Sequence, residues 1–311
     1  MTIMRRGVKE MKNEFFYPSR DGVTQIHAIE WIPDGEPVGV LQMCHGMVEY
    51  IDRYDEFASF LATQGYYVVG HDHLGHGLSI VSEDKLGYFH HPDGNDVVIS
   101  DIQQLRVKTQ EKYPKLPYFM MGHSMGSFLL RQYLGLYSGG LSGAVIMGTG
   151  NQPNAILLGG MLVCKLISLF KGWEHRSKLV NNMAAGGYEK KLGLSWLSKN
   201  PENQEKYLKD PLCGFVFTLN AYYHMFQGMF LMNTQEKEGK ASKALPLFFV
   251  SGAEDPVGQN GKGVEKVVKL YQESGYQKVQ MKLYEGDTHE ILQECDRQVV
   301  FQDILNFLRG N

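Results

Sequence analysis

A pentapeptide in this 311-residue chain has the residue types and spacing of a serine nucleophile on a sharp turn. Gly122-His123-Ser124-Met125-Gly126 has the pattern G-x-S-x-G, and it lies between an apolar run at residues 118–121 and a helical pattern that begins near Ser127. The two glycines allow the tight turn, because a side chain at either position would collide with a neighbouring strand or helix. The turn exposes Oγ of Ser124, and N–H groups at the helix N-terminus favour an oxyanion. We therefore predict that Ser124 attacks a carbonyl carbon.

A serine nucleophile needs a base within hydrogen-bonding reach, and that base needs a carboxylate to fix its tautomer. Proteins with this elbow supply the three groups in the order serine, acid, histidine. Asp255 follows an apolar run at residues 247–251, and His289 follows the next predicted strand, at residues 279–284. Because ligands bind at the carboxyl ends of parallel strands, both side chains should reach the same edge of the sheet as Ser124.

Two other acids compete with Asp255 for this role. Glu254 precedes Asp255 directly, and Asp287 lies two residues before His289. Asp255 is favoured because Pro256 fixes a turn at the end of the strand. Glu254 and Asp287 would then be charged loop residues exposed to solvent.

A second loop is predicted to complete the oxyanion hole. His45-Gly46-Met47-Val48-Glu49 follows a buried apolar run at residues 38–43. Its backbone N–H would act together with that of the residue after the nucleophile, so Met47 and Met125 are the predicted donors. We also expect Gly46, His123 and Tyr50, which lie beside these groups in the sequence, to contact the substrate.

Three further histidines cluster in His71-Asp72-His73-Leu74-Gly75-His76-Gly77. Histidine ligands for a metal would be expected to have a carboxylate-rich partner motif, and none accompanies them. The two glycines favour a tight structural loop instead. The four cysteines are scattered without a C-x-x-C pair, so we expect free thiols, no disulfide framework and no metal.

Alternating strand and helix patterns must position these groups. An antiparallel hairpin is predicted at residues 14–17 and 24–31, with a turn at 18–22. Further strands are predicted at residues 38–43, 66–70, 118–121, 144–147, 247–251 and 279–284, and helices at 54–64, 97–112, 127–136, 264–273 and 298–308. This alternation predicts a mainly parallel sheet covered on both faces.

The alternation stops near Gly150 and resumes near Leu245. The intervening residues hold apolar helical stretches, such as 161–170 and 215–231, without a clear strand. We therefore predict an α/β core formed by residues 1–150 and 241–311, with residues 151–240 inserted as a helical cap.

Five motifs in order resemble the monoacylglycerol lipase and lysophospholipase branch of the α/β-hydrolases, also called serine aminopeptidase-like hydrolases. They are His45-Gly46-Met47-Val48-Glu49 with Arg53-Tyr54, then Asp72-His73-Leu74-Gly75-His76-Gly77-Leu78-Ser79, Gly122-His123-Ser124-Met125-Gly126, Asp255-Pro256-Val257-Gly258 and His289-Glu290-Ile291-Leu292. The resemblance covers most of the chain. It departs from the family pattern at Tyr50, where members often have histidine, and at Ser127, where they often have glycine.

The resemblance implies an α/β-hydrolase fold and hydrolysis of a single-chain acylglycerol or lysophospholipid ester, without a cofactor, through an acyl-enzyme under a mobile cap. Proline iminopeptidases share the fold, the order of the three groups and the cap position, and a short-chain carboxylesterase is a further alternative. An aminopeptidase would bind a free ammonium with cap carboxylates. The cap acids occur among lysines: Glu174, Glu189, Glu202, Glu205 and Asp210. Apolar cap residues instead favour an acyl chain: Leu157, Leu158, Met161, Leu162, Phe215, Phe217, Met225, Phe226 and Met229.

Composition narrows the partners and the location. A formal net charge of -3 with interspersed charges offers no basic surface for nucleic acid. Residues 1–13 carry charges but no apolar core of a secretory signal, so we expect a cytoplasmic protein. The longest apolar stretch, residues 156–170, is interrupted by Gly159, Gly160 and Lys165 and falls short of the roughly 20 residues that span a bilayer. We expect it at most to touch a membrane surface transiently.

Overall fold

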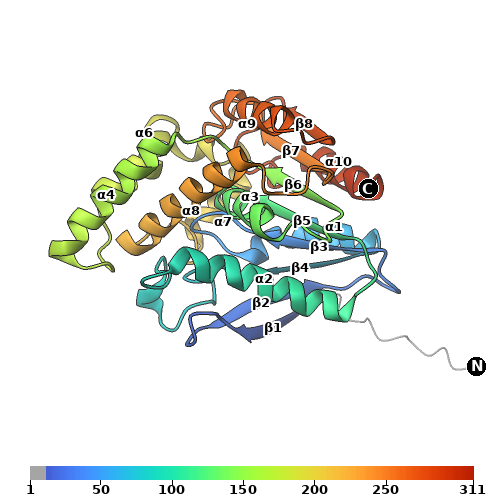
Figure 1. Ribbon diagram of the computed structural model, residues 1–311, viewed down its shortest axis with the longest axis horizontal. Helices are drawn as coiled ribbons and strands as arrows, with labels where there is room; N and C mark the ends of the chain where they lie inside the picture. Colours follow the sequence, from blue (N-terminus) through green and yellow to red (C-terminus); the bar gives the residue numbers. More distant parts are fainter. Residues whose placement is uncertain (1–11) are drawn as a thin grey trace, which may run out of the picture.

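The structure, a computed structural model, describes residues 12–311 except the side chains of residues 185, 186 and 189. Its described residues form an eight-stranded sheet with the order β1-β2-β4-β3-β5-β6-β7-β8 (Figure 1). The strands are β1 (Lys12–Pro18), β2 (Gln25–Trp31), β3 (Gly39–Cys44), β4 (Tyr66–His71), β5 (Tyr118–His123), β6 (Gly143–Met147), β7 (Leu247–Gly252) and β8 (Val279–Tyr284). The opening hairpin is antiparallel, β2 pairs antiparallel with β4, and the remaining pairs are parallel. This confirms the predicted fold class.

Helices cover both faces of the sheet, as the continuous apolar strands require. Every residue of β3 to β7 is buried, which is typical of parallel strands between two helical layers. On one face, α1 (Asp55–Thr63) and α10 (Arg297–Arg309) share a hydrophobic core with the sheet. On the other face lie α2 (Gly94–Lys112), α3 (Met125–Tyr137) and α9 (Lys262–Glu273).

The helices between β6 and β7 all fall within the predicted cap. They are α4 (Asn154–Lys171), α5 (Lys178–Asn181), α6 (Gly187–Leu192), α7 (Pro201–Lys209) and α8 (Leu219–Glu238). Single turns occur at η1 (Ile51–Tyr54), η2 (Glu83–Lys85), η3 (Asn182–Gly186) and η4 (Gly193–Trp196). Figure 1 shows α4 leaning away from the sheet with α8 between it and the core. That residues 151–240 form a distinct unit stays a prediction.

The helix predicted at residues 215–231 begins later than the sequence pattern suggested. The Thr218 side chain accepts a hydrogen bond from the Ala221 N–H, so Thr218 is the N-cap of α8. Phe215 and Phe217 precede the helix, and their rings pack against the ring of His76 in the core. Apolar content alone did not reveal this boundary.

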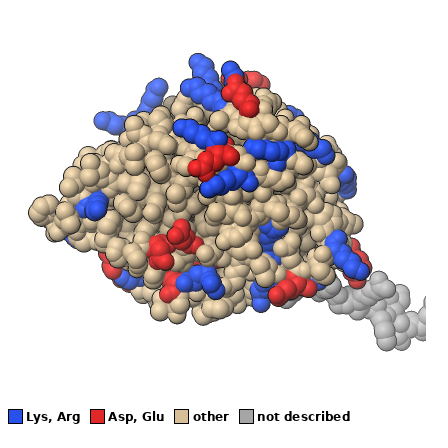
Figure 2. All heavy atoms as spheres, viewed as in Figure 1, with Lys and Arg blue, Asp and Glu red and all other residues tan. Residues whose placement is uncertain are grey.

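One face of α4 is exposed and apolar. Leu157, Gly160 and Cys164 are buried towards α8, whereas the opposite side exposes Leu158, Leu162, Leu166, Leu169 and Phe170. Figure 2 shows few charged side chains over this projecting part of the molecule. Among the described residues, α4 alone is long and apolar enough to cross a membrane by length and composition, with a mean hydropathy of 1.6 over 18 residues. In this fold it packs along α8 as part of the cap.

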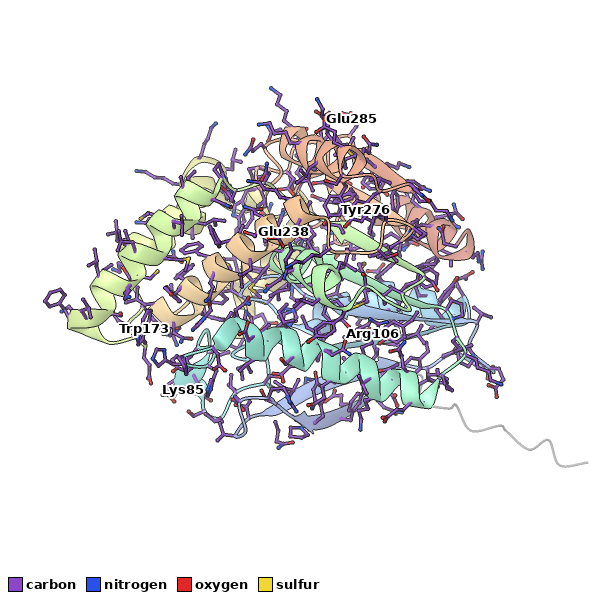
Figure 3. The ribbon with its side chains drawn as sticks, viewed as in Figure 1. Lys85, Arg106, Trp173, Glu238, Tyr276 and Glu285 are labelled. Carbon is purple, nitrogen blue, oxygen red and sulfur yellow. The ribbon has the colours of Figure 1, made fainter. Side chains whose placement is uncertain are left out.

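The far end of α4 is tied to a loop of the core. Figure 3 shows Trp173 just beyond this end of the helix, with Lys85 close by. Lys85 forms an ion pair of 2.7 Å with Glu174, and Arg176 donates a hydrogen bond of 2.6 Å to the Leu86 carbonyl oxygen. The cap is therefore held to the core at a point far from its connections to β6 and β7.

Candidate active site

Ser124 lies at the turn between β5 and α3, in a backbone conformation that non-glycine residues rarely adopt. Its φ is 52° and its ψ is -119°. A Cβ on Gly126 would lie 2.1 Å from the Cys44 carbonyl oxygen, and one on Gly122 would lie 2.3 Å from the Gly126 carbonyl oxygen. Both glycines are thus required by close backbone contacts, which is the reason that the sequence pattern suggested.

The three predicted catalytic side chains form one chain of hydrogen bonds. Nε2 of His289 lies 2.8 Å from Oγ of Ser124, and Nδ1 of His289 lies 2.9 Å from Oδ2 of Asp255. Asp255 and His289 follow β7 and β8, which are parallel neighbours in the sheet. The parallel register therefore brings together two side chains that are far apart in the sequence.

The two competing acids have other partners. Glu254 forms an ion pair of 2.8 Å with Lys199, and both side chains are exposed. Asp287 is buried near Asp296 and Glu294, and burial together with these carboxylates raises its pKa to about 7. The structure places only Asp255, among the three acids weighed, against His289.

Charge interactions tune the two buried groups of this chain in opposite directions. Burial alone would raise the pKa of the Asp255 carboxyl, but His289 and the Val257 N–H outweigh burial and hold that pKa below its ordinary value. Burial alone would lower the pKa of His289, but the Asp255 carboxylate raises it above its ordinary value of 6.5. The pair can therefore stabilise an imidazolium formed when His289 takes a proton from Ser124.

Met47 and Met125, the predicted oxyanion donors, both line a cavity together with Ser124. The loop that carries Met47 is strained, because Val48 has a φ of 54° and β-branched residues avoid that region. The Val48 carbonyl oxygen accepts a hydrogen bond of 2.9 Å from the Gly214 N–H of the cap. The cap thus helps to hold the strained loop beside the nucleophile.

The three predicted substrate contacts lie outside the residues that line this cavity. Gly46 is buried, and its N–H donates to Oε1 of Glu49. His123 lies beneath the elbow, where Nε2 donates to the His289 carbonyl oxygen at 3.1 Å. Tyr50 donates a hydrogen bond of 2.6 Å to Oδ2 of Asp210 in the cap. In this structure Gly46 and His123 therefore hold neighbouring loops in place, and Tyr50 holds the cap.

A buried ionic network lies next to His289. Its charged members, Arg53, Glu49 and Glu290, belong to the sequence motifs, whereas Asn203 belongs to none of them. The guanidinium of Arg53 contacts Glu49 and Glu290, each at 2.5 Å, and donates to Asn203 of α7 at 3.1 Å. The Tyr207 ring of the same helix lies 5.1 Å from this guanidinium. Arg53 thereby joins the loop of Met47, the loop of His289 and the cap.

The cavity at Ser124 has a volume of about 350 Å³ and mostly apolar walls. Its cap lining includes Leu157, Gly160, Met225, Phe226 and Met229. Four of the predicted apolar cap residues are therefore in place. Leu158 and Leu162 were predicted with them but are exposed on the other side of α4, and Phe215 and Phe217 pack elsewhere.

Trp196 is a cavity residue that the sequence did not reveal. Its ring centroid lies 5.4 Å from that of His289, and the ring centroid of Tyr188 lies 5.8 Å from that of Trp196. Both residues come from short cap helices without a motif, so no pattern singled them out. Trp196 therefore forms an aromatic wall of the cavity directly beside the base.

The clustered histidines of the second motif are buried under the loop of Met47. The rings of His73 and His76 pack against that of His45, with centroids of His45 and His73 4.2 Å apart, and the ring of His71 packs against that of His73. Among the described residues, no group of three or more His, Cys, Asp or Glu side chains is arranged to hold a metal.

Known proteins resemble the chain over most of its length. The sequence profile of the family described as "Serine aminopeptidase, S33" matches residues 35–296. The chain is 29% identical to a monoglyceride lipase of Mus musculus, covering 85% of this chain and 79% of the relative. It is 25% identical to a monoacylglycerol lipase of Mycolicibacterium smegmatis, covering 97% and 98%. A thermostable carboxyl esterase from Bacillus coagulans, solved with glycerol, has a TM-score of 0.87 and 28% identity, covering 97% of this chain and 99% of that one.

Proposed function

This chain belongs to the serine aminopeptidase S33 family of α/β-hydrolases, and we propose that it cleaves esters with a single long acyl chain, such as monoacylglycerols or lysophospholipids. It is a serine hydrolase related to monoacylglycerol lipases and esterases. The observation that carries the proposal is the apolar cavity that reaches Ser124 from the cap.

The proposed mechanism uses the hydrogen-bonded chain as an acyl-transfer centre. Ser124 attacks the ester carbonyl while His289 takes its proton, and Asp255 holds the imidazole and stabilises its charge. The N–H groups of Met47 and Met125 bind the oxyanion. His289 then protonates the leaving alcohol, and water releases the acyl group from Ser124 by the same steps in reverse.

Charge pairing in the cap supports an ester over an aminoacyl substrate. Glu174, Glu202 and Glu205 pair with lysines at the surface, and Asp210 accepts a hydrogen bond from Tyr50. The side chain of Glu189 lies outside the described residues. None of the four described acids lines the cavity, so an ammonium group bound there would gain no carboxylate partner from them.

The exposed apolar face of α4 is a second observation that supports a lipid substrate. The cavity wall and this face belong to the same helix, so a membrane surface that contacts Leu162 and Leu166 would bring lipid close to the cap. We propose a cytoplasmic protein that makes this contact transiently.

The proposal is tested by hydrolysis rates over a panel of monoacylglycerols, lysophospholipids, simple acyl esters and aminoacyl anilides. Long-chain esters should be cleaved fastest. Faster cleavage of the prolyl or alanyl anilides would instead identify an aminopeptidase.

A further inference from the structure

The peptide unit between Gly46 and Met47 has its orientation set by the side chain of His45. Nδ1 of His45 lies 2.8 Å from the Gly46 carbonyl oxygen, which can only accept a hydrogen bond. The peptide bond is trans, and in a planar trans peptide the C=O and N–H vectors point in opposite directions. The bond to the Gly46 oxygen therefore also fixes the direction of the Met47 N–H, which donates to no protein group in the described part of the chain.

His45 can hold this peptide only as the tautomer with a proton on Nδ1. A neutral imidazole has one donor and one acceptor nitrogen. Nε2 of His45 accepts the main-chain N–H of His73 at 2.9 Å, and a backbone N–H can only donate. The partners on both sides thus assign the proton to Nδ1 without ambiguity.

The ring of His73 in turn holds the backbone carbonyl group of His45. Nε2 of His73 donates to the His45 carbonyl oxygen at 3.2 Å, so Nδ1 of His73 must accept, and it lies 3.2 Å from Nε2 of His71. All three histidines are 0% exposed. Burial, reinforced by the neighbouring histidines, lowers the pKa of each ring well below its ordinary value, so the rings are neutral at physiological pH.

We propose that His45 is a positioning residue for the reaction, whose Nδ1–H aims the Met47 N–H at the oxyanion. The inference rests on the proposed function, because an oxyanion forms only when Ser124 attacks an acyl carbonyl. The preceding peptide is fixed independently, since the Gly46 N–H donates to Oε1 of Glu49 at 2.6 Å. Because His45 and Glu49 fix the two peptide units on either side of Gly46, the Met47 N–H has only one orientation.

Two substitutions separate the donor role of His45 from its packing. In His45→Asn the side-chain amide reaches the position of Nδ1 and can still donate to the Gly46 oxygen. In His45→Gln the amide reaches the position of Nε2 and can accept the His73 N–H, but it cannot donate to Gly46. The matched control is His76→Gln, because the His76 ring packs 5.1 Å from that of His45 and makes no bond to this loop.

Catalytic constants and binding of an alkylboronic acid, whose adduct with Ser124 mimics the tetrahedral intermediate, measure the effect. We expect His45→Asn to keep kcat within about threefold and His45→Gln to lose about 100-fold in kcat with little change in KM, the loss typical of one oxyanion donor. The inhibition constant of the boronic acid should rise by a similar factor in His45→Gln only. His76→Gln should lower the melting temperature without changing kcat.

Equal losses in the Asn and Gln variants, in proportion to their melting temperatures, would show a purely structural role and overturn the inference. Where a variant fails to fold, the wild-type protein labelled with 15N-histidine decides, because His45 must show a protonated Nδ1 and an unprotonated Nε2. The opposite tautomer overturns the inference. Wild-type protein that cleaves no ester in the panel would instead overturn the proposed function, and the inference with it.

Discussion

Oδ2 of Asp255 lies 2.9 Å from Nδ1 of His289, with both side chains buried. The carboxylate also accepts the Val257 N–H at 2.9 Å and the Ser251 hydroxyl at 3.1 Å. These further bonds fix the carboxylate independently of the histidine. Asp255 is thereby rigid enough to determine the tautomer of His289.

Replacing Asp255 should therefore remove most of the activity and little of the fold. Asp255→Asn should lower kcat by roughly 10⁴-fold, because the amide favours the wrong histidine tautomer. The matched control is Glu254→Gln, which loses only an exposed ion pair with Lys199. Steady-state kinetics of both variants test the assignment. A rate near that of the wild type in Asp255→Asn, beside a strongly reduced rate in Glu254→Gln, would reverse it.

Ser124→Ala should abolish turnover and labelling by a fluorophosphonate probe, because Ser124 occupies the strained elbow within reach of His289. Ser127→Ala is the matched control, since its hydroxyl donates only to the Ser124 carbonyl oxygen. That variant should still be labelled. Mass spectrometry of the labelled peptide identifies the site, and a label on another serine in the Ser124→Ala protein would refute the assignment.

The pKa of His289 sets the acid side of the pH profile. Burial lowers this pKa, but the Asp255 carboxylate raises it by more than burial lowers it. The pKa of His289 therefore lies above its ordinary value of 6.5. His289 acts as a base only when neutral, so kcat/KM should fall as the pH drops through the raised pKa, with a midpoint above 6.5. In Asp255→Asn the raising charge is gone, so the midpoint of the residual activity should move to lower pH. A profile with the same midpoint in both proteins would contradict this.

Sequence patterns predicted those parts of the site that depend on local turns and on strand order. The elbow at Ser124 follows from two glycines, and the meeting of Asp255 with His289 follows from neighbouring parallel strands. Tyr50 is predicted from the sequence as a substrate contact, but its hydrogen bond to Asp210 could not be predicted, because Asp210 is 160 residues away in a cap without motifs. The exposed position of Leu162 depends on how α4 is rotated against α8, which apolar content does not encode.

The apolar face of α4 should bind membranes. Leu162→Asp with Leu166→Asp places two charges on this face, where wild-type side chains are 57% and 50% exposed. Wild-type protein should float with anionic liposomes at low salt, and the double variant should not. Leu208→Asp, at a still more exposed position on α7 with 70% exposure, is the matched control and should still float.

Hydrolysis of a short soluble ester should be the same in all three proteins, because neither Leu162 nor Leu166 lines the cavity. If the wild-type protein does not float with the liposomes, the proposed membrane contact is wrong and the protein is an esterase that does not bind membranes.

Acyl-chain length should control the rate until the cavity is full. Each buried methylene contributes roughly 0.8 kcal/mol, so kcat/KM should rise about three- to fourfold per added carbon and then level off. The measurement is a series of p-nitrophenyl and 1-monoacylglycerol esters from acetyl to palmitoyl, beside prolyl and alanyl anilides. Aminoacyl anilides should be poor substrates, because their ammonium would enter an apolar cavity at a cost of several kcal/mol.

A variant of the cavity wall makes this prediction specific to the site. Met229→Phe adds an aromatic ring to the α8 wall and should move the plateau to shorter chains. Met232→Leu, on the same helix but buried outside the cavity lining, should leave the plateau in place. A flat or falling profile in the wild-type protein would remove the lipid substrate and leave a short-chain esterase. A plateau that Met229→Phe does not shift would show that the acyl chain lies elsewhere.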